Sequence, residues 1–189
     1  MLKTENIPDN KLTAAIQNSD ANAFKLLYFR YHEAIFRYAL RRTGEYETAR
    51  DLTQDVFARL WHSRKNLDPG QSIKAYLYRT ATNLAINHLK KKILRNTESL
   101  EKNENLSVES DLPDFETEEL IAKALNALPK KERMIFALNR FEGLKYAEIA
   151  DVLRISVKTV EKYMSRALKS LRLYLKDLLI LWIAIQHFF

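Results

Sequence analysis

The residues best suited to bind a ligand lie along one stripe of a helix that the sequence predicts from Ser72 to about Arg95. At 100° per residue, an aromatic ring, two amides and two cations fall within an arc of about 80°. Amides hydrogen-bond to base edges, cations contact phosphates and aromatic rings stack on unpaired bases, so the stripe favours nucleic-acid binding over a merely solvated polar face. Its members are Tyr76, Arg79, Asn83, Asn87 and Lys90.

A second candidate surface lies near the carboxyl end of the chain. Residues 145–153 and 157–176 predict two helices around a short turn at 154–156, the spacing of a helix-turn-helix. The apolar back of the second helix consists of Val160, Met164, Ala167, Leu168 and Leu171, and its front carries Lys158, Lys162, Ser165 and Lys169. Such a helix suits the DNA major groove, with a charged solvated face as the alternative.

A pair of carboxylates marks a third helix, predicted over residues 51–61. Leu52, Val56 and Leu60 form its core stripe, while Asp51 and Asp55 share another side with Gln54. Carboxylates four residues apart repel by roughly 0.2–0.5 kcal/mol, so a partner should offset them. That partner is either Arg59 on an ordinary solvated face or another molecule.

An enzymatic interpretation has little support. A metal-dependent hydrolase would have to use Asp51 and Asp55 with four scattered histidines, which lack the ligand spacing of a metal site. We therefore predict no catalytic residue, no metal and no cofactor. A duplex-binding response regulator or repressor is the other alternative, but it would need no strand-binding helix. The histidines are His32, His62, His88 and His187.

Composition predicts an all-α fold of two small helical domains, of which the second holds the helix-turn-helix. Only 3 Gly and 4 Pro occur in 189 residues, too few for turn-dense sheets. Residues 64–96 carry 8 basic and 1 acidic groups, whereas residues 97–119 carry 1 and 9. The acidic stretch is poor in large apolar residues and predicts a linker. The expected divisions are 1–95, an acidic linker at 96–117, 118–176, and an apolar tail at 177–189.

The overall charge and the missing cysteines indicate where such a chain works. A net charge of +7 suits a polyanionic partner. No Cys is present, which excludes disulfides and fits a reducing compartment. Because the amino terminus lacks the apolar core of a signal peptide, we expect an intracellular protein.

Together these segments resemble the extracytoplasmic-function sigma factors, the compact two-domain branch of the bacterial sigma-70 family, over roughly residues 20–175. DLTQDVFARLW is similar to the family's polymerase-binding helix. SIKAYLYRTATNLAINHLKKK resembles the helix that opens and reads the −10 element. LPKKERMIFALNRFEGLKYAEIADVLRISVKTVEKYMSRALKSLR resembles the domain that binds the −35 element. The order of the three matches makes the resemblance specific.

The resemblance implies a role for each stripe. The residues implied to dock on core RNA polymerase are Asp51, Gln54, Asp55 and Trp61. Those implied to hold the opened −10 strand of promoter DNA are Leu67, Asp68, Gln71, Tyr76, Arg79, Asn83, Asn87 and Lys90. Those implied to read the −35 duplex are Lys158, Thr159, Glu161, Lys162, Ser165 and Arg166.

The resemblance also implies partners and a location. We expect an anti-sigma factor, membrane-tethered in many relatives, and a bacterial cytoplasmic protein that joins the nucleoid within the holoenzyme. Two features depart from the family pattern. Arg154 stands where the turn often has Gly, and a left-handed conformation there would cost on the order of 1 kcal/mol. The tail from Leu178 to Phe189 lies outside the resemblance. We expect it to dock on the protein's own domains, with an anti-sigma or self-association surface and attachment to a membrane surface as the alternatives.

Overall fold

The computed structural model describes residues 7–98 and 123–188, with side chains placed for 7–94 and 123–174. Every element named in these ranges is a helix, which confirms the predicted all-α fold. The chain divides into two compact units, Met1–Ser110 and Asp111–Phe189, and each is described by itself. Most of the predicted linker lies outside the described residues. Within the described ranges, no helix has the length and apolar character needed to cross a bilayer.

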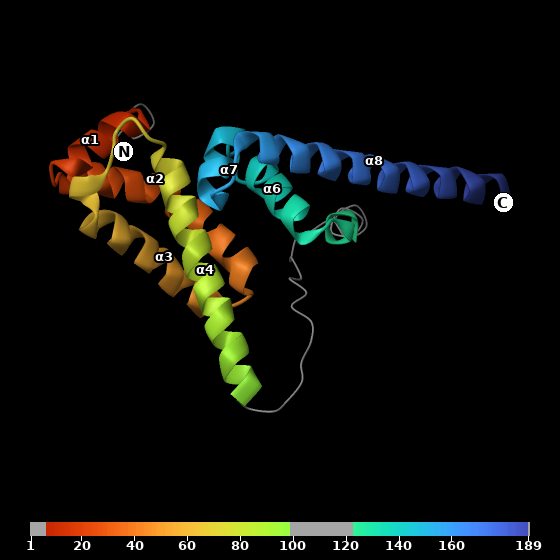
Figure 1. Cartoon of the computed structure of the whole chain (residues 1–189), viewed down its shortest axis with the longest axis horizontal. Coiled ribbons are helices and arrows are strands. Elements are labelled where there is room, and N and C mark those ends of the chain that lie inside the picture. The colour runs from red at the N-terminus through yellow and green to blue at the C-terminus, as the bar shows by residue number, and fades with distance from the viewer. Residues whose placement is uncertain (1–6, 99–122, 189) are drawn as a thin grey trace. The chain divides into compact units, whose positions relative to one another are not determined.

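The first unit is built around a long central helix. Its elements are α1 (Asp9–Gln17), α2 (Ala21–Thr43), α3 (Tyr46–His62), the short 3-10 helix η1 (Arg64–Asn66) and α4 (Ile73–Glu98) (Figure 1). Helix α2 packs against α1, α3 and α4, and α3 also packs on α4. The core between them is formed by Leu27, Ile35, Val56, Leu60 and Leu77, all fully buried.

Local signals in the sequence fix the helix ends of this unit. The Asp20 carboxylate accepts hydrogen bonds from the backbone N–H groups of Asn22 and Ala23, which caps α2. Gly44 ends α2 at φ 71°, a left-handed conformation that a glycine adopts without strain. Ser72 caps α4 by accepting from the N–H of Ala75 at 3.1 Å, as the sequence predicted.

The predicted core stripes of the first unit are confirmed with one correction. The spacing of Ile73, Leu77, Ala81, Leu84 and His88 predicts one buried face of α4. The first four are buried, but His88 is only half-buried. Helix α4 also reaches Glu98, three residues past the expected domain boundary.

Sequence analysis did not identify α1. Its Asp9 carboxylate accepts hydrogen bonds from Arg30 and Tyr31 of α2, which ties the two helices together.

The second unit is the predicted helix-turn-helix, preceded by further helical residues. Residues 123–127 are helical, followed by α6 (Lys130–Arg140), α7 (Tyr146–Leu153) and α8 (Val157–Phe188). All three named helices pack on one another around a buried core. That core includes Ile135, Leu138, Ile149, Val160 and Met164.

The turn between α7 and α8 has the strained residue that the sequence indicated. Arg154 is left-handed, at φ 53° and ψ 48°. Ser156 then caps α8 by accepting from the N–H of Thr159 at 3.1 Å. Helix α8 continues to Phe188, but its side chains from residue 175 onward lie outside the described residues, and so does the predicted docking of the tail.

Candidate nucleic-acid interfaces

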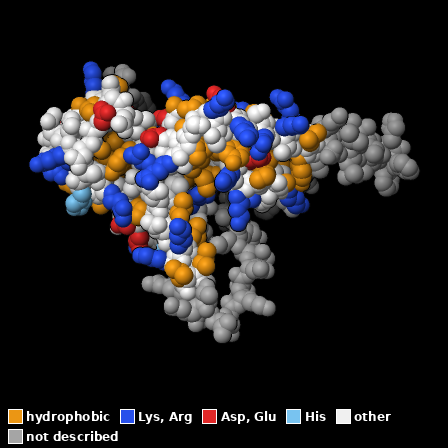
Figure 2. Space-filling model, viewed as in Figure 1, with side chains coloured by type: hydrophobic (Ala, Val, Ile, Leu, Met, Phe, Trp, Pro, Cys, Tyr) orange, Lys and Arg blue, Asp and Glu red, His pale blue; other side chains and the backbone are white. Residues whose placement is uncertain are grey.

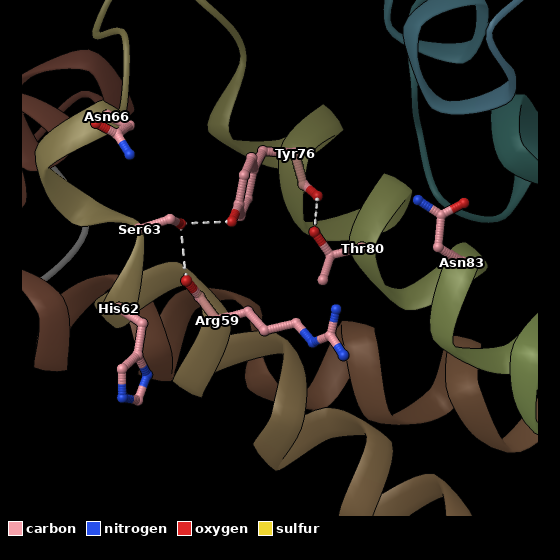
Figure 3. Close-up of a pocket in the computed structure, with 7 residues that line it drawn as sticks. All are labelled: Arg59, His62, Ser63, Asn66, Tyr76, Thr80 and Asn83. Atoms are coloured by element: carbon pink, nitrogen blue, oxygen red, sulfur yellow. Dashed lines mark hydrogen bonds between the residues drawn. The ribbon is translucent and has the colours of Figure 1, made fainter.

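A polar pocket opens in the first unit where the carboxyl end of α3 and η1 meet the amino-terminal half of α4. It is a shallow depression, open to solvent, with a volume of about 490 Å³. Figure 3 shows the side chains around it, contributed by α3, by the connection that follows it and by α4. The lining residues are Arg59, His62, Ser63, Asn66, Tyr76, Thr80 and Asn83.

A relay of hydrogen bonds fixes one wall of the pocket (Figure 3). The Ser63 hydroxyl donates to the backbone oxygen of Arg59 at 2.7 Å, and its oxygen lies 2.7 Å from the Tyr76 hydroxyl. The single hydrogen of Ser63 is used by that carbonyl, so Tyr76 is the donor in the second bond. The relay joins α4 to the end of α3 and holds the Tyr76 ring upright in the pocket.

Two further lining residues are tied to their own helices. The Thr80 hydroxyl donates to the backbone oxygen of Tyr76 at 2.9 Å. The His62 Nδ1 lies 2.7 Å from the backbone oxygen of Ala58, which makes Nδ1 the protonated nitrogen. These bonds keep both side chains in place without any ligand.

Arg59 gives the pocket a positive charge. Its side chain extends from α3 beneath Thr80, a residue of α4 (Figure 3). Among the described residues, no ion pair joins Arg59 to Asp55, whereas the Arg50 guanidinium lies 3.8 Å from the carboxylate of Asp51. A guanidinium without an internal carboxylate partner suits an anionic or acceptor-rich ligand.

The predicted stripe on α4 divides between the pocket and the open helix surface. Tyr76 and Asn83 line the pocket, and the Arg79 guanidinium lies 5.8 Å from the Tyr76 ring centre. Asn87 and Lys90 are exposed on later turns of α4, beyond the pocket.

The loop before α4 is shaped from within. Leu67 is buried, with 7% of its surface exposed. The Asp68 carboxylate accepts from the N–H of Gly70 at 2.8 Å and from the side chain of Gln71 at 3.3 Å. Leu67 therefore packs inside the unit and Asp68 stabilises the turn by its hydrogen bonds, whereas Gln71 remains exposed.

The carboxyl half of α4 is anchored to the turn between α2 and α3. The Lys92 ammonium donates to the Glu45 carboxylate at 2.5 Å. That bond, helped by the hydroxyl of Thr48, lowers the pKa of Glu45 below its ordinary value. The contact is exposed and contributes little to stability, but it orients this end of α4.

The predicted docking residues of α3 do not all lie on one surface. Asp51, Gln54 and Asp55 are exposed together, as their spacing predicted. Trp61 is half-buried instead, because its ring packs on Phe24 at a centroid distance of 5.0 Å and under the Arg64 guanidinium at 4.5 Å.

The helix-turn-helix presents its predicted face to the outside. Lys158, Glu161, Lys162, Ser165 and Arg166 are exposed on α8, and their side chains make no hydrogen bond or ion pair within the described part of the chain. Thr159 differs, since it is half-buried and its hydroxyl lies 2.8 Å from that of Ser156. Figure 2 shows Lys and Arg side chains over the visible face of the described residues, with few Asp and Glu among them.

Sequence reasoning missed five pocket residues: Thr80 of α4, which lies outside the predicted stripe, and four residues from α3 and the turn after it. Arg59, His62, Ser63 and Asn66 recur at steps of three and four, a polar stripe that the search for a core face passed over. No cluster of three His, Asp or Glu that could hold a metal occurs among the side chains that the structure places.

Two family profiles match this chain, one in each unit. Sigma-70 region 2 matches residues 27–93, and Sigma-70, region 4 matches residues 118–171. The chain is 28% identical to the ECF RNA polymerase sigma factor SigW of Bacillus subtilis, covering 86% of this chain and 94% of that protein. It is 30% identical to RNA polymerase sigma factor YlaC of the same species, covering 75% of this chain and 85% of that protein.

A solved structure has a similar fold. The sigma factor RpoE of Bartonella quintana, crystallised with the anti-sigma factor NepR, matches with a TM-score of 0.62 at 21% identity. The match covers 81% of this chain and 96% of that one.

Proposed function

The chain belongs to the sigma-70 family as an extracytoplasmic-function RNA polymerase sigma factor, and from this premise we propose how its two units divide the work. A sigma factor binds core RNA polymerase and directs it to promoters. Residues 1–95, within the first unit, would dock on the polymerase and capture the opened −10 strand. Residues 118–176, within the second unit, would hold the −35 duplex, with the acidic stretch 96–117 as the tether.

The observation that carries the proposal is the pocket beside Tyr76 and Asn83. A base inside a duplex cannot enter it, because its edges are paired and its faces are stacked. Extruding a base costs a few kcal/mol, which contacts with the aromatic, amide and hydroxyl groups of the pocket repay. Arg59 supplies charge next to these groups. Capture of one unpaired base would therefore hold the promoter open and select its sequence in the same step.

Other residues of α4 extend this surface along the strand. Asn87 and Lys90 are exposed on successive turns beyond the pocket, where an amide and an ammonium can follow the strand past the captured base. Leu67 and Asp68 would act indirectly, by fixing the loop that carries the exposed Gln71.

The exposed face of α8 is proposed to enter the major groove at the −35 element. Its side chains stay unbonded among the described residues and can adapt to base edges. Lysine and arginine donate to guanine or to phosphate, whereas Glu161 can accept from cytosine. Thr159 would contact the DNA sugar-phosphate backbone from the first turn of α8, where its hydroxyl lies against that of Ser156.

The carboxylate pair of α3 is proposed to dock on the clamp helices of the polymerase. Asp51 and Asp55 repel each other; the Arg50 guanidinium lies 3.8 Å from the Asp51 carboxylate, whereas no ion pair joins Asp55 to a cation among the described residues, so a basic partner would relieve the remaining repulsion. Trp61 would position this helix from beneath, through its contact with Phe24.

Further partners and the location are part of the same proposal. The Bartonella quintana sigma factor RpoE is known in complex with the anti-sigma factor NepR. We propose that an anti-sigma factor, tethered to the membrane, binds this chain as well. The chain would act in the bacterial cytoplasm, at the nucleoid when it is in holoenzyme. Sigma factors are transcription initiation factors, and we assign no catalytic residue, metal or cofactor here, since the polymerase performs the chemistry.

Run-off transcription tests this function. Purified core polymerase should start at new genomic promoters only when the chain is added. On such a promoter, Asn83→Ala should slow opening about tenfold while closed-complex affinity changes less than twofold. Equal losses in both steps would contradict base capture, and failure of the wild-type chain to redirect the polymerase would contradict the function itself.

A further inference from the structure

The hydrogen bonds inside the pocket decide which base fits it. We propose that the pocket selects a base with an exocyclic amino group and rejects thymine, with the Tyr76 and Thr80 hydroxyls as the discriminating groups. This inference rests on the proposed capture of an unpaired base and names the chemistry of that base.

Both hydroxyl hydrogens are already committed. The Tyr76 hydroxyl donates to Ser63, because the single hydrogen of Ser63 goes to the backbone oxygen of Arg59. The Thr80 hydroxyl donates to the backbone oxygen of Tyr76. What each hydroxyl has left for a ligand is an oxygen lone pair.

A wall of lone pairs favours a ligand that donates. Cytosine, adenine and guanine each carry an exocyclic amino group, whereas thymine carries two carbonyl oxygens around one ring N–H. A thymine carbonyl at this wall would meet lone pairs, unless Tyr76 or Thr80 gave up its internal bond and turned its hydrogen outward. Thymine binding is therefore penalised in either case, because it costs either an internal hydrogen bond of a hydroxyl or the hydrogen bond between the hydroxyl oxygen and the ligand.

The remaining lining groups do not reverse this preference. Asn66 and Asn83 each carry both a donor and an acceptor, so they can follow either kind of base. Arg59 donates only, and its charge suits the strand phosphate or an acceptor of the base, either a ring nitrogen or a carbonyl oxygen, which every captured base brings. Arg59 therefore sets how tightly the strand binds, while Tyr76 and Thr80 set which base is held.

Single-stranded oligonucleotides test the preference on the reconstituted holoenzyme. The probes are fluorescent ten-residue thymidine strands with one central position changed to cytosine, adenine, 2-pyrimidinone or purine, alongside the all-thymine strand. The last two bases are cytosine and adenine without their amino groups. We expect cytosine and adenine to increase affinity about tenfold over thymine. Their analogues that carry hydrogen in place of the amino group, 2-pyrimidinone and purine, should return the affinity to within about twofold of that for thymine.

Two pairs of variants connect the preference to the hydroxyls. Tyr76→Phe and Thr80→Val each keep the shape of the side chain, and each should reduce the tenfold discrimination to about threefold. Arg59→Gln should weaken all strands alike and reduce the salt dependence of binding by about one charge. Tyr46→Phe is the matched control, since Tyr46 is 62% exposed on the first turn of α3 and does not line the pocket.

The outcomes separate this inference from the proposed function. If the cytosine, adenine, 2-pyrimidinone, purine and all-thymine strands bind with equal affinity, the preference for an amino group is overturned while base capture stands. Unchanged discrimination in both hydroxyl variants would overturn the assignment to Tyr76 and Thr80. Failure of holoenzyme to bind any strand, or no effect of Asn83→Ala on strand affinity, would overturn base capture itself.

Discussion

The two units present their candidate DNA-binding groups in opposite ways. In the first, Ser63, Tyr76 and Thr80 are already joined by hydrogen bonds around a concave site. In the second, Lys162, Arg166 and their neighbours stand exposed on one face of α8, without hydrogen bonds among the described residues. One surface is fixed before its ligand arrives, and the other is free to adapt.

The prebuilt pocket and the exposed helix face suit two forms of DNA, the opened strand and the duplex. An extruded base is a small rigid ligand, and a prebuilt pocket recognises it at low entropic cost. A duplex offers a long groove whose base edges vary, so long flexible side chains on a rigid helix are better suited to read it. Mutations should therefore act on single strands in the first unit and on duplex in the second.

The largest expected effect tests whether the units are separate at all. Ile149 is fully buried in the second unit, and Ile149→Ala should destabilise that unit by about 2–5 kcal/mol. Because the core of the first unit does not include this residue, its own unfolding should be unaffected. Ile35→Ala, equally buried in the first unit, is the mirror control. Hydrogen exchange measures each unit in the intact chain, and a loss of protection in both units from either variant would contradict separateness.

A second test separates polymerase docking from both DNA surfaces. Asp55→Arg places a cation where we propose that a basic partner docks, and like charges across an interface are costly. We expect core-polymerase affinity to fall at least about 30-fold, which corresponds to about 2 kcal/mol. Glu33→Arg makes the same change on the exposed side of α2 and should have little effect. Undiminished polymerase binding by Asp55→Arg would exclude this face of α3 from docking.

The adaptable face can be examined at one base contact. Lys162→Ala should change the preference among −35 sequences by about tenfold, if the ammonium contacts a base edge. The affinity of holoenzyme for a set of single-substituted −35 duplexes measures this preference. A uniform loss over all sequences would instead mean that Lys162 contacts only phosphate.

The smallest expected effect compares two left-handed residues, one in each unit. Arg154 has φ 53° and Ser19 has φ 67°. Arg154→Gly should stabilise the second unit by up to about 1 kcal/mol, since glycine adopts this conformation without strain. Ser19→Gly should gain less, because the Ser19 hydroxyl accepts a hydrogen bond from the Arg64 side chain at 2.9 Å. Thermal unfolding measures both, and a destabilised Arg154→Gly would show that Arg154 makes a contact that outweighs its strain.

The helices of both units could be predicted because their signals are local. Apolar residues at three- and four-residue steps predict the buried stripes of α3 and α4. Ser72 and Ser156 precede periodic segments, as N-cap residues do, and they cap α4 and α8. Helix α1 was missed because it is short, and its tie to α2 through Asp9 joins residues far apart in the sequence.

Most of the pocket could not be predicted for a related reason. The period of α4 identified Tyr76 and Asn83, but the opposite wall belongs to α3 and η1, and only tertiary packing brings the two together. Arg59 shows this most clearly, because spacing alone made it a partner for Asp55, whereas the fold directs it into the pocket. Leu67 and Trp61 were instead predicted to contact a partner. Leu67 is buried and Trp61 packs on Phe24, so both position the surface residues around them.

One measurement tests the division between strand capture and duplex reading most directly. Holoenzymes with Asn83→Ala and with Lys162→Ala are each titrated with a single-stranded −10 oligonucleotide and, separately, with a −35 duplex. We predict that Asn83→Ala weakens only strand binding and that Lys162→Ala weakens only duplex binding, each about tenfold. If both variants weaken both DNA forms equally, the two surfaces do not have separate ligands and the account is contradicted.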